Sequence, residues 1–409
     1  MVRERQSRTV QNRAVCAMRR RNLGSDNQST GLPTWKRGVT TLQVLVFCPA
    51  FRESDMPRHT ASMRAKPFHV SLVAIPEAVV STLSGIFDVM NAFTMMPPSG
   101  DAPLRAPPPF QVEIVGLRPG SLDLASNLPV TVQRSVAALD ATDIIIIPSV
   151  LLGPDGWEKG RHPELVDWLR TMHSRGALLC SACSGIFLLA ETGLFDGMDA
   201  TVHFGYTRAF TTAYPEVPIH PERALVISGK HEELITSGAS MTWHDLVLYL
   251  IARHAGATAA QTVARFFALQ WHQDGLAPYI VFEGRNDHGD LAVQAAQDWI
   301  ATHFAVANPL EEMIKRAGLT ERTFKRRFTS ATGISPIAYV QRLRIEDAKR
   351  RLERTEGSVD EISWQVGYEE PAFFRRLFKR VTGLAPGAYR RRFNIPDYSL
   401  PQPKTQRPD

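Results

Sequence analysis

Two hydrophobic periods alternate along the middle of the chain. Short apolar runs, such as the isoleucine-rich run at 143–148, are typical of strands buried on both faces of a sheet. Segments with apolar residues three or four positions apart, such as 79–93, are typical of helices with one buried face. Their alternation from residue 67 onward predicts a parallel sheet covered by helices. The expected strands are 69–76, 110–116, 143–148 and 177–181, and the expected helices are 79–93, 164–174, 186–191, 246–253 and 258–270.

The last hundred residues contain one pattern twice. FKRRFTSATGISPIAY at 324–339 recurs as FRRLFKRVTGLAPGAY at 374–389, an offset of 50 residues. The matched positions keep the phenylalanines, one arginine, a Thr-Gly pair, a proline and an Ala-Tyr pair. Helical spacing turns Phe324 and Phe328 inward and leaves the basic side chains outside. A repeat of this kind predicts one supersecondary unit used twice.

Each copy of the repeat has the pattern of a helix-turn-helix, which predicts an all-α domain with two such units. Gly318 permits the turn in the first copy and Thr320 is placed to cap the helix that follows. Gly367 holds the equivalent position in the second copy. An outward basic face on the second helix can enter the major groove of DNA, where arginine binds guanine or phosphate. The expected helices are 310–317, 321–330, 361–366 and 371–381, with 342–352 joining the two copies.

Charge is divided unevenly along a chain whose formal net charge is +6. Residues 1–66 carry 13 Lys and Arg against 4 Asp and Glu, residues 67–289 carry 13 against 22, and residues 290–395 carry 19 against 13. An acidic middle followed by a basic end indicates that the end alone binds a polyanion. Arginines solvated around an aromatic core are a simpler interpretation, but such a core does not require matched arginines in both copies.

These motifs resemble the AraC/XylS transcription regulators. The resemblance covers about 290–393 and rests on AGLTERTFKRRF at 317–328, VGYEEPAFFRRLFKR at 366–380, and the TG-x-x-P-x-x-Y that ends both copies. It implies two helix-turn-helix units on one monomer that read adjacent major-groove segments of double-stranded DNA. A homodimer and contact with RNA polymerase are the further expectations. The expected DNA contacts are Thr320, Arg322, Thr323, Lys325 and Arg326, followed by Glu370, Ala372, Phe373, Arg375 and Arg376; Ala372 departs from the small hydroxyl residue usual in the family.

CSACSG at 180–185 lies where an expected strand meets an expected helix. A cysteine between small residues at such a junction has the pattern of a nucleophile elbow. The surrounding chain, about 67–283, resembles the PfpI and class I glutaminase amidotransferase-like fold, including TSGASMTWHD at 236–245 and HQDG at 272–275. The resemblance implies a flavodoxin-like α/β sensor domain with a parallel sheet, ahead of the all-α domain.

The same resemblance argues against catalysis, so no catalytic residue is expected. Peptidase-like members have histidine where this chain has Ser184, and the position of a deglycase carboxylate falls on Thr82, with Glu77 nearby. Cys183 and His203 then form a degenerate elbow that serves an effector site. The expected ligand-binding residues are Ser149, Cys183, Ser184, His203 and Met241. The effector is expected to be a small polar molecule, and relatives suggest an amino-acid-like compound or a quaternary amine.

Three other interpretations remain open at this point. A cysteine-dependent amidase or deglycase could be fused to a DNA-binding domain, and a nucleoid-type binder would bind DNA without an effector. Cys180-x-x-Cys183 could form a redox pair, although a core cysteine is favoured at Cys180 because it lies inside a strand. No cofactor is expected, and no metal, since no second Cys or His pair has ligand spacing. Four single histidines are expected to be solvated: His162, His173, His220 and His231.

Segment composition completes the expected organisation. The apolar runs are shorter than the roughly 18 residues that a membrane helix needs, and no apolar stretch follows the basic N-terminus, so a cytoplasmic protein without a membrane partner is expected. Residues 1–66 are expected to be disordered or to precede the true start at Met56 or Met63. The other expected segments are a sensor domain at 67–283, a linker at 284–289, a DNA-binding domain at 290–395 and a loose tail at 396–409.

Overall fold

A computed structural model describes residues 66–96 and 107–395. The expectations for residues 1–65 and for the tail from 396 onward therefore lie outside the described residues. None of the helices in the described part is both long and apolar enough to cross a bilayer.

The N-terminal domain is built on a seven-stranded sheet with the order β5-β2-β1-β6-β7-β9-β8. Six strands run parallel, whereas β8 pairs antiparallel with β9, so the sheet is mixed at one edge rather than wholly parallel. Strand β6 is at the centre, and its four isoleucines have no exposed surface. The strands are β1 Phe68–Val73, β2 Phe110–Gly116, β5 Arg134–Ser135, β6 Ile144–Ile147, β7 Leu178–Ala182, β8 Leu225–Ser228 and β9 Leu234–Ser237.

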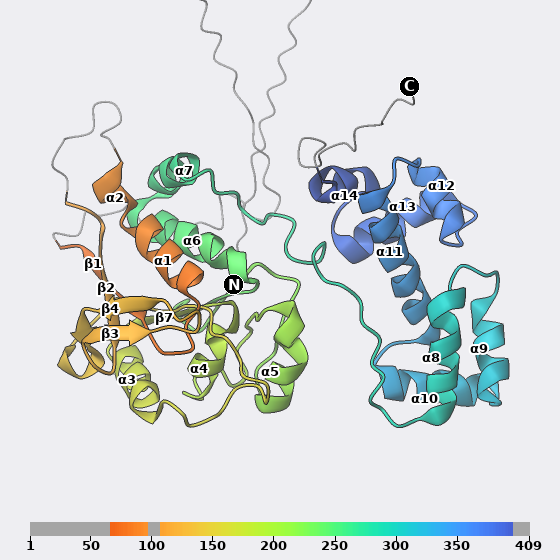
Figure 1. Ribbon diagram of the computed structural model, residues 1–409, viewed down its shortest axis with the longest axis horizontal. Helices are drawn as coiled ribbons and strands as arrows, with labels where there is room; N and C mark the ends of the chain where they lie inside the picture. The colour runs from red at the N-terminus through yellow and green to blue at the C-terminus, as the bar shows by residue number, and fades with distance from the viewer. Residues whose placement is uncertain (1–65, 97–106, 396–409) are drawn as a thin grey trace, which may run out of the picture. The chain divides into compact units, whose positions relative to one another are not determined.

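Helices lie on both sides of this sheet, as the buried isoleucine strand requires. Figure 1 shows α1, α6 and α7 on one side and α3, α4 and α5 on the other. Gly85 allows α1 to approach α6 closely, because a Cβ at Gly85 would lie 2.6 Å from the indole of Trp243. The helices are α1 Val80–Met90, α2 Ala92–Met95, α3 Pro163–Ser174, α4 Ile186–Ala190, α5 Thr207–Ala213, α6 Trp243–Ala255 and α7 Ala257–Phe266.

The C-terminal domain is helical and has two separate hydrophobic cores, one for each copy of the repeat. Phe324 and Phe328 are fully buried in the first core, and Phe374 and Phe378 are fully buried in the second, which confirms the predicted inward faces. The helices are α8 Leu291–His303, α9 Pro309–Ala317, α10 Glu321–Thr332, α11 Pro336–Arg354, α12 Val359–Gln365, α13 Pro371–Thr382 and α14 Pro386–Phe393.

Aromatic packing repeats with the sequence. The rings of Phe328 and Tyr339 meet edge to face at 5.3 Å and 88°, and those of Phe378 and Tyr389 at 5.4 Å and 84°. The matched aromatic positions therefore build the same contact in both units, with α11 running between them.

Candidate DNA-reading helices and candidate ligand site

The first unit places α10 behind a tight turn. Gly318 ends α9 in the left-handed region at φ +64°, a conformation that glycine adopts at little cost. Thr320 is at the N-cap position of α10, as predicted, but it does not make the expected cap bond. Its hydroxyl instead donates to the hydroxyl of Thr323 at 3.0 Å.

The outer face of α10 carries the predicted basic residues. Arg322, Lys325 and Arg326 are exposed, and Thr323 is half-buried. Lys325 pairs with Glu321 one turn earlier. Within the described residues, Arg322 and Arg326 have no hydrogen-bond or ion-pair partner, so these two guanidinium groups are available to an external anion.

The second unit presents a comparable face on α13. Ala372, Arg375 and Arg376 are exposed, and 38% of Phe373 is exposed. Arg375 pairs with Asp360 of α12, whereas Arg376 has no partner in the described part of the chain. Glu370 is exposed at the N-cap position, and its side chain makes no cap bond there.

One half-buried arginine connects the two units. Arg344 of α11 donates to the carbonyls of Phe304 at 2.7 Å and Val306 at 3.0 Å, which follow α8 in the first unit. It also donates to the carbonyl of Gly367 at 2.7 Å, in the turn of the second unit. The sequence analysis missed this residue because nothing in its local pattern separates it from the exposed arginines of the same helix.

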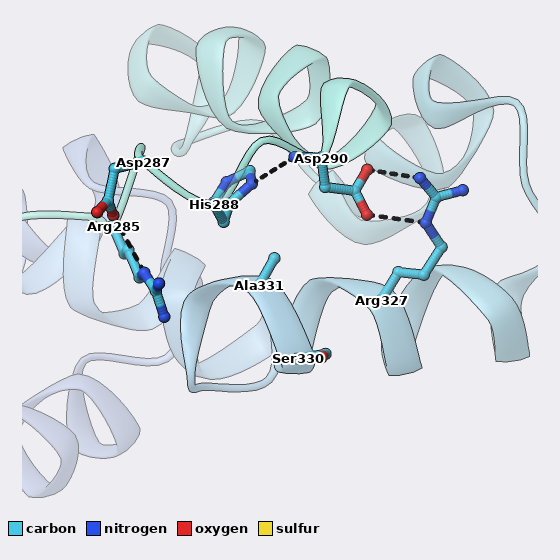
Figure 2. A pocket seen from close by; sticks show the side chains of 7 residues that line it. All are labelled: Arg285, Asp287, His288, Asp290, Arg327, Ser330 and Ala331. Atoms are coloured by element: carbon cyan, nitrogen blue, oxygen red, sulfur yellow. Dashed lines mark hydrogen bonds and ion pairs between the residues drawn. The ribbon is translucent and has the colours of Figure 1, made fainter.

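A second polar network holds the start of α8 against α10. Asp290 caps α8 by accepting from the backbone of Ala292 and Val293, and it receives two bonds from Arg327 at 2.6 and 2.8 Å. His288 lies beside it, and its Nδ1 accepts from the backbone N–H of Asp290. Figure 2 shows these groups around a shallow hollow. Arg327 therefore supports the fold, unlike its outward neighbour Arg326.

The predicted elbow in the N-terminal domain has the backbone conformation of a nucleophile elbow. Cys183 follows β7 directly, has φ +54° and is 1% exposed. Gly185 passes so close to the end of the neighbouring strand β6 that a Cβ there would lie 2.4 Å from the carbonyl oxygen of Pro148. A positive φ at a non-glycine residue marks a conformation that the surrounding structure must enforce.

The elbow cysteine has a hydroxyl partner rather than a base. Its Sγ lies 3.4 Å from Oγ of Ser240, and among the described residues it makes no bond to an imidazole or a carboxylate. His203 is half-buried, and its Nδ1 accepts from the backbone of Gly205 at 3.1 Å. Burial lowers the pKa of His203, so the ring is neutral near pH 7.

The other predicted ligand residues differ in what they can offer. The hydroxyl of Ser184 donates to the carbonyl of Val150 at 2.6 Å and accepts from its N–H at 2.9 Å, so it is occupied. Ser149 is buried and accepts a hydrogen bond from Thr82 at 3.1 Å. Met241 is 59% exposed. No hydrogen bond joins His203 or Met241 to the elbow within the described residues, so the joint site remains a prediction.

Two expectations about single residues have definite outcomes. Cys180 is fully buried as a free thiol, and burial raises its pKa, which fits a core cysteine. His162 was expected to be solvated, and this is wrong: it is 7% exposed and lies 3.0 Å from a carboxylate oxygen of Glu77. The pair links two loops distant in sequence, which local pattern does not reveal.

Comparison with known proteins follows the same division of the chain. The DJ-1/PfpI family matches residues 106–253, and a helix-turn-helix domain family matches residues 313–392. The chain therefore combines a DJ-1/PfpI domain with a C-terminal helix-turn-helix domain.

Curated relatives have the same organisation and are transcriptional regulators by name. CdhR of Pseudomonas aeruginosa is 29% identical over 66% of this chain and 80% of its own length. GlxA of Rhizobium meliloti is 26% identical over 50% of this chain, and GbdR of Pseudomonas aeruginosa is 24% identical over 61%. The match spans 63% of GlxA and 66% of GbdR, less than two thirds of each. These relatives support a DNA-binding regulator.

Proposed function

We propose that the chain is a sequence-specific transcription regulator in which α10 and α13 read DNA and the DJ-1/PfpI domain binds a small effector. The observation that carries the DNA-reading part is the matched pair Arg326 and Arg376. Both are exposed at the same position of a repeated helix, above a repeated phenylalanine core, and neither has a partner within the described residues. An exposed guanidinium without an internal partner can donate two hydrogen bonds to guanine or two to a phosphate group.

The test replaces each arginine by alanine in the full chain. Arg326→Ala and Arg376→Ala should each weaken binding to the specific operator by about 1–3 kcal/mol if the residue reads a base. The operator would first be selected from random duplexes, and affinities measured by fluorescence anisotropy at fixed salt. Arg118→Ala is the matched control, because Arg118 of the N-terminal domain is also exposed and has no partner in the described part of the chain.

Two results would count against this proposal. Unchanged affinity in both variants would place the reading face elsewhere. Equal binding to specific and random duplexes, with a steep loss in salt, would instead support a nucleoid-type binder.

The effector part rests on the elbow. Cys183 has a positive φ there, and within the described residues no imidazole or carboxylate is bonded to its thiol. An effector of amino-acid-like or quaternary amine chemistry is the first class to screen. Thermal shift of the full chain detects such a binder, because a ligand selective for the native state stabilises it. His203→Ala should abolish the shift while His231→Ala, at an exposed site, leaves it intact. A shift that persists in both variants would move the ligand site away from the elbow.

The same regulator is proposed to be a cytoplasmic homodimer that contacts RNA polymerase. The elbow geometry also supports a second candidate, an amidase or deglycase activity at Cys183. Alkylation by iodoacetamide, followed against pH, separates the two, because a nucleophile would show a thiolate that titrates well below pH 8. A titration at the ordinary thiol value supports the sensor.

A further inference from the structure

Three side chains that the DNA-reading and elbow sites do not use lie together at the start of α6. His244 and Asp245 are in the first turn of that helix, and His272 comes from the segment after α7, 27 residues beyond Asp245. Each offers one ligand atom, and the three atoms all lie within 4.8 Å of one another. His244 and Asp245 are buried at 8% and 4% exposure.

Asp245 already fixes one of the histidines. Its two carboxylate oxygens accept from the backbone N–H of His272 at 2.8 Å and from Nδ1 of the same residue at 2.7 Å. Trp271 packs against the hydrophobic core of the N-terminal domain, which anchors this segment. A carboxylate and an imidazole are therefore held in place before any ligand arrives.

A purely structural role for the pair of Asp245 and His272 does not explain the environment of His244. Its Nδ1 is buried and has no hydrogen-bond partner among the described residues, although its ring lies 5.2 Å from that of His272. Leaving a buried polar nitrogen unpaired costs roughly 1–3 kcal/mol. A cation bound to Nδ1 would satisfy this nitrogen, whereas a structural role for Asp245 and His272 leaves it unsatisfied.

We infer that His244, Asp245 and His272 bind a divalent transition-metal ion of the Zn²⁺ type. Two imidazoles and one carboxylate are a ligand set that Zn²⁺ and its neighbours accept. Bonds of about 2.0–2.2 Å place two ligand atoms roughly 3–4 Å apart, so the present spacing needs an adjustment of about 1 Å. The ion would displace the proton between Nδ1 of His272 and Asp245, and Nε2 of the same ring would take up that proton. A search for metal-ligand spacing in the sequence could not find these three residues, because His272 is 27 residues away from Asp245 along the chain.

The experiment uses the full chain after treatment with EDTA. Zn²⁺ is titrated calorimetrically into wild type, His244→Ala and His272→Ala, and Co²⁺ absorption reports the ligand geometry. Wild type should hold one ion more than either variant, or bind that ion at least about 100-fold more tightly, since even residues that only support ligands change affinity 10–100-fold. Comparing differences removes any contribution from the four cysteines.

Controls distinguish ligand loss from damage to the fold. His244→Ala breaks no hydrogen bond in the described part of the chain, so it should keep the near-ultraviolet circular dichroism of wild type. His162→Ala removes another buried histidine from a carboxylate pair, 3.0 Å from Glu77, where Arg161 already occupies the second oxygen. It should bind Zn²⁺ as wild type does. Equal stoichiometry and affinity in wild type, His244→Ala and His272→Ala would overturn the inference, as would retention of the ion in His244→Ala alone.

Discussion

Arginines of the helical domain differ in what their guanidinium groups contact. Arg344 donates to three backbone carbonyls and Arg327 to one carboxylate, whereas Arg326 and Arg376 have no partner within the described residues. The guanidinium groups of Arg344 and Arg327 stabilise the fold. Those of Arg326 and Arg376 are available to a ligand. One residue type thus provides both internal connections and a surface for recognition.

Arg344→Lys should destabilise the helical domain. Lysine keeps the charge, but its single ammonium cannot reach three carbonyls in the directions that the planar guanidinium serves. Each carbonyl left without a donor in a partly buried place costs on the order of 1 kcal/mol, so a loss of about 2–3 kcal/mol is expected. Urea denaturation measures it, with Arg350→Lys, an exposed position on the same helix, as the control. Equal midpoints for the two variants would contradict this role of Arg344.

At the scale of elements, the two units end their second helices in the same way. Gly333 after α10 has φ +79° and Gly383 after α13 has φ +78°. The preceding threonines, Thr332 and Thr382, each donate to the carbonyl four residues earlier. The repeated Thr-Gly pair is therefore a helix terminator, and glycine is needed for backbone conformation rather than for space.

Gly333→Ala should lower stability by about 1 kcal/mol, because a left-handed conformation is costly for a residue with a Cβ. A Cβ at Gly333 would meet nothing within 4 Å, so steric contact adds no penalty. Gly387→Ala, inside α14, is the matched control and should instead raise stability by about 0.5 kcal/mol. Thermal unfolding of both variants gives the comparison. A destabilised Gly387→Ala together with an unaffected Gly333→Ala would be the reverse of this expectation.

The bond between Asp290 and Arg327 predicts a pH dependence. Arg327 holds the pKa of Asp290 below its ordinary value, assisted by the backbone N–H groups of α8. A depressed pKa adds stability above the unfolded value of about 4, and this stability is lost as the pH falls through the folded value. Asp290→Asn keeps a good cap and removes the charge. Wild type should therefore be more stable than this variant near pH 6, and the difference should shrink as the pH falls below about 4. A constant difference across that range would exclude the ion pair as its source.

The sequence predicted helices and strands best where the spacing of apolar residues and the residue types indicated the same element. The two helices of each helix-turn-helix, the buried phenylalanines and the four central strands were found, because each has a regular apolar spacing. Strands β8 and β9, the hairpin of β3 (Gly120–Asp123) and β4 (Pro129–Val132), and helices α8 and α14 were not predicted. Strands of four residues are too short to show a period. Contacts that join distant segments, such as those of Arg344 and His162, could not be derived from local pattern.

At the scale of the whole molecule, the change in net charge from acidic to basic falls near residue 290, where the helical domain begins. Residues 67–289 carry 22 Asp and Glu against 13 Lys and Arg, whereas residues 290–395 carry 19 Lys and Arg against 13 Asp and Glu. Two helix-turn-helix units on one continuous helix match DNA best when their half-sites lie one helical turn apart on one face.

Operator spacing tests this expectation directly. Inserting 5 base pairs between the two half-sites turns one of them to the opposite face, so affinity should fall about tenfold or more. An insertion of 10 or 11 base pairs returns the two half-sites to the same face of the duplex but moves them farther apart. Helix α11 is too short to span the longer separation, so affinity should stay low. Gel-shift titrations with the full chain compare the three duplexes. Full affinity for the 5-base-pair insertion would mean that only one unit contacts DNA.

The continuous helix α11 has a consequence for how a signal can act. With 19 residues in one helix and Arg344 bonded on both sides of it, there is no hinge at which one reading unit could swing against the other. A signal from the proposed effector would therefore present or withdraw both reading units together.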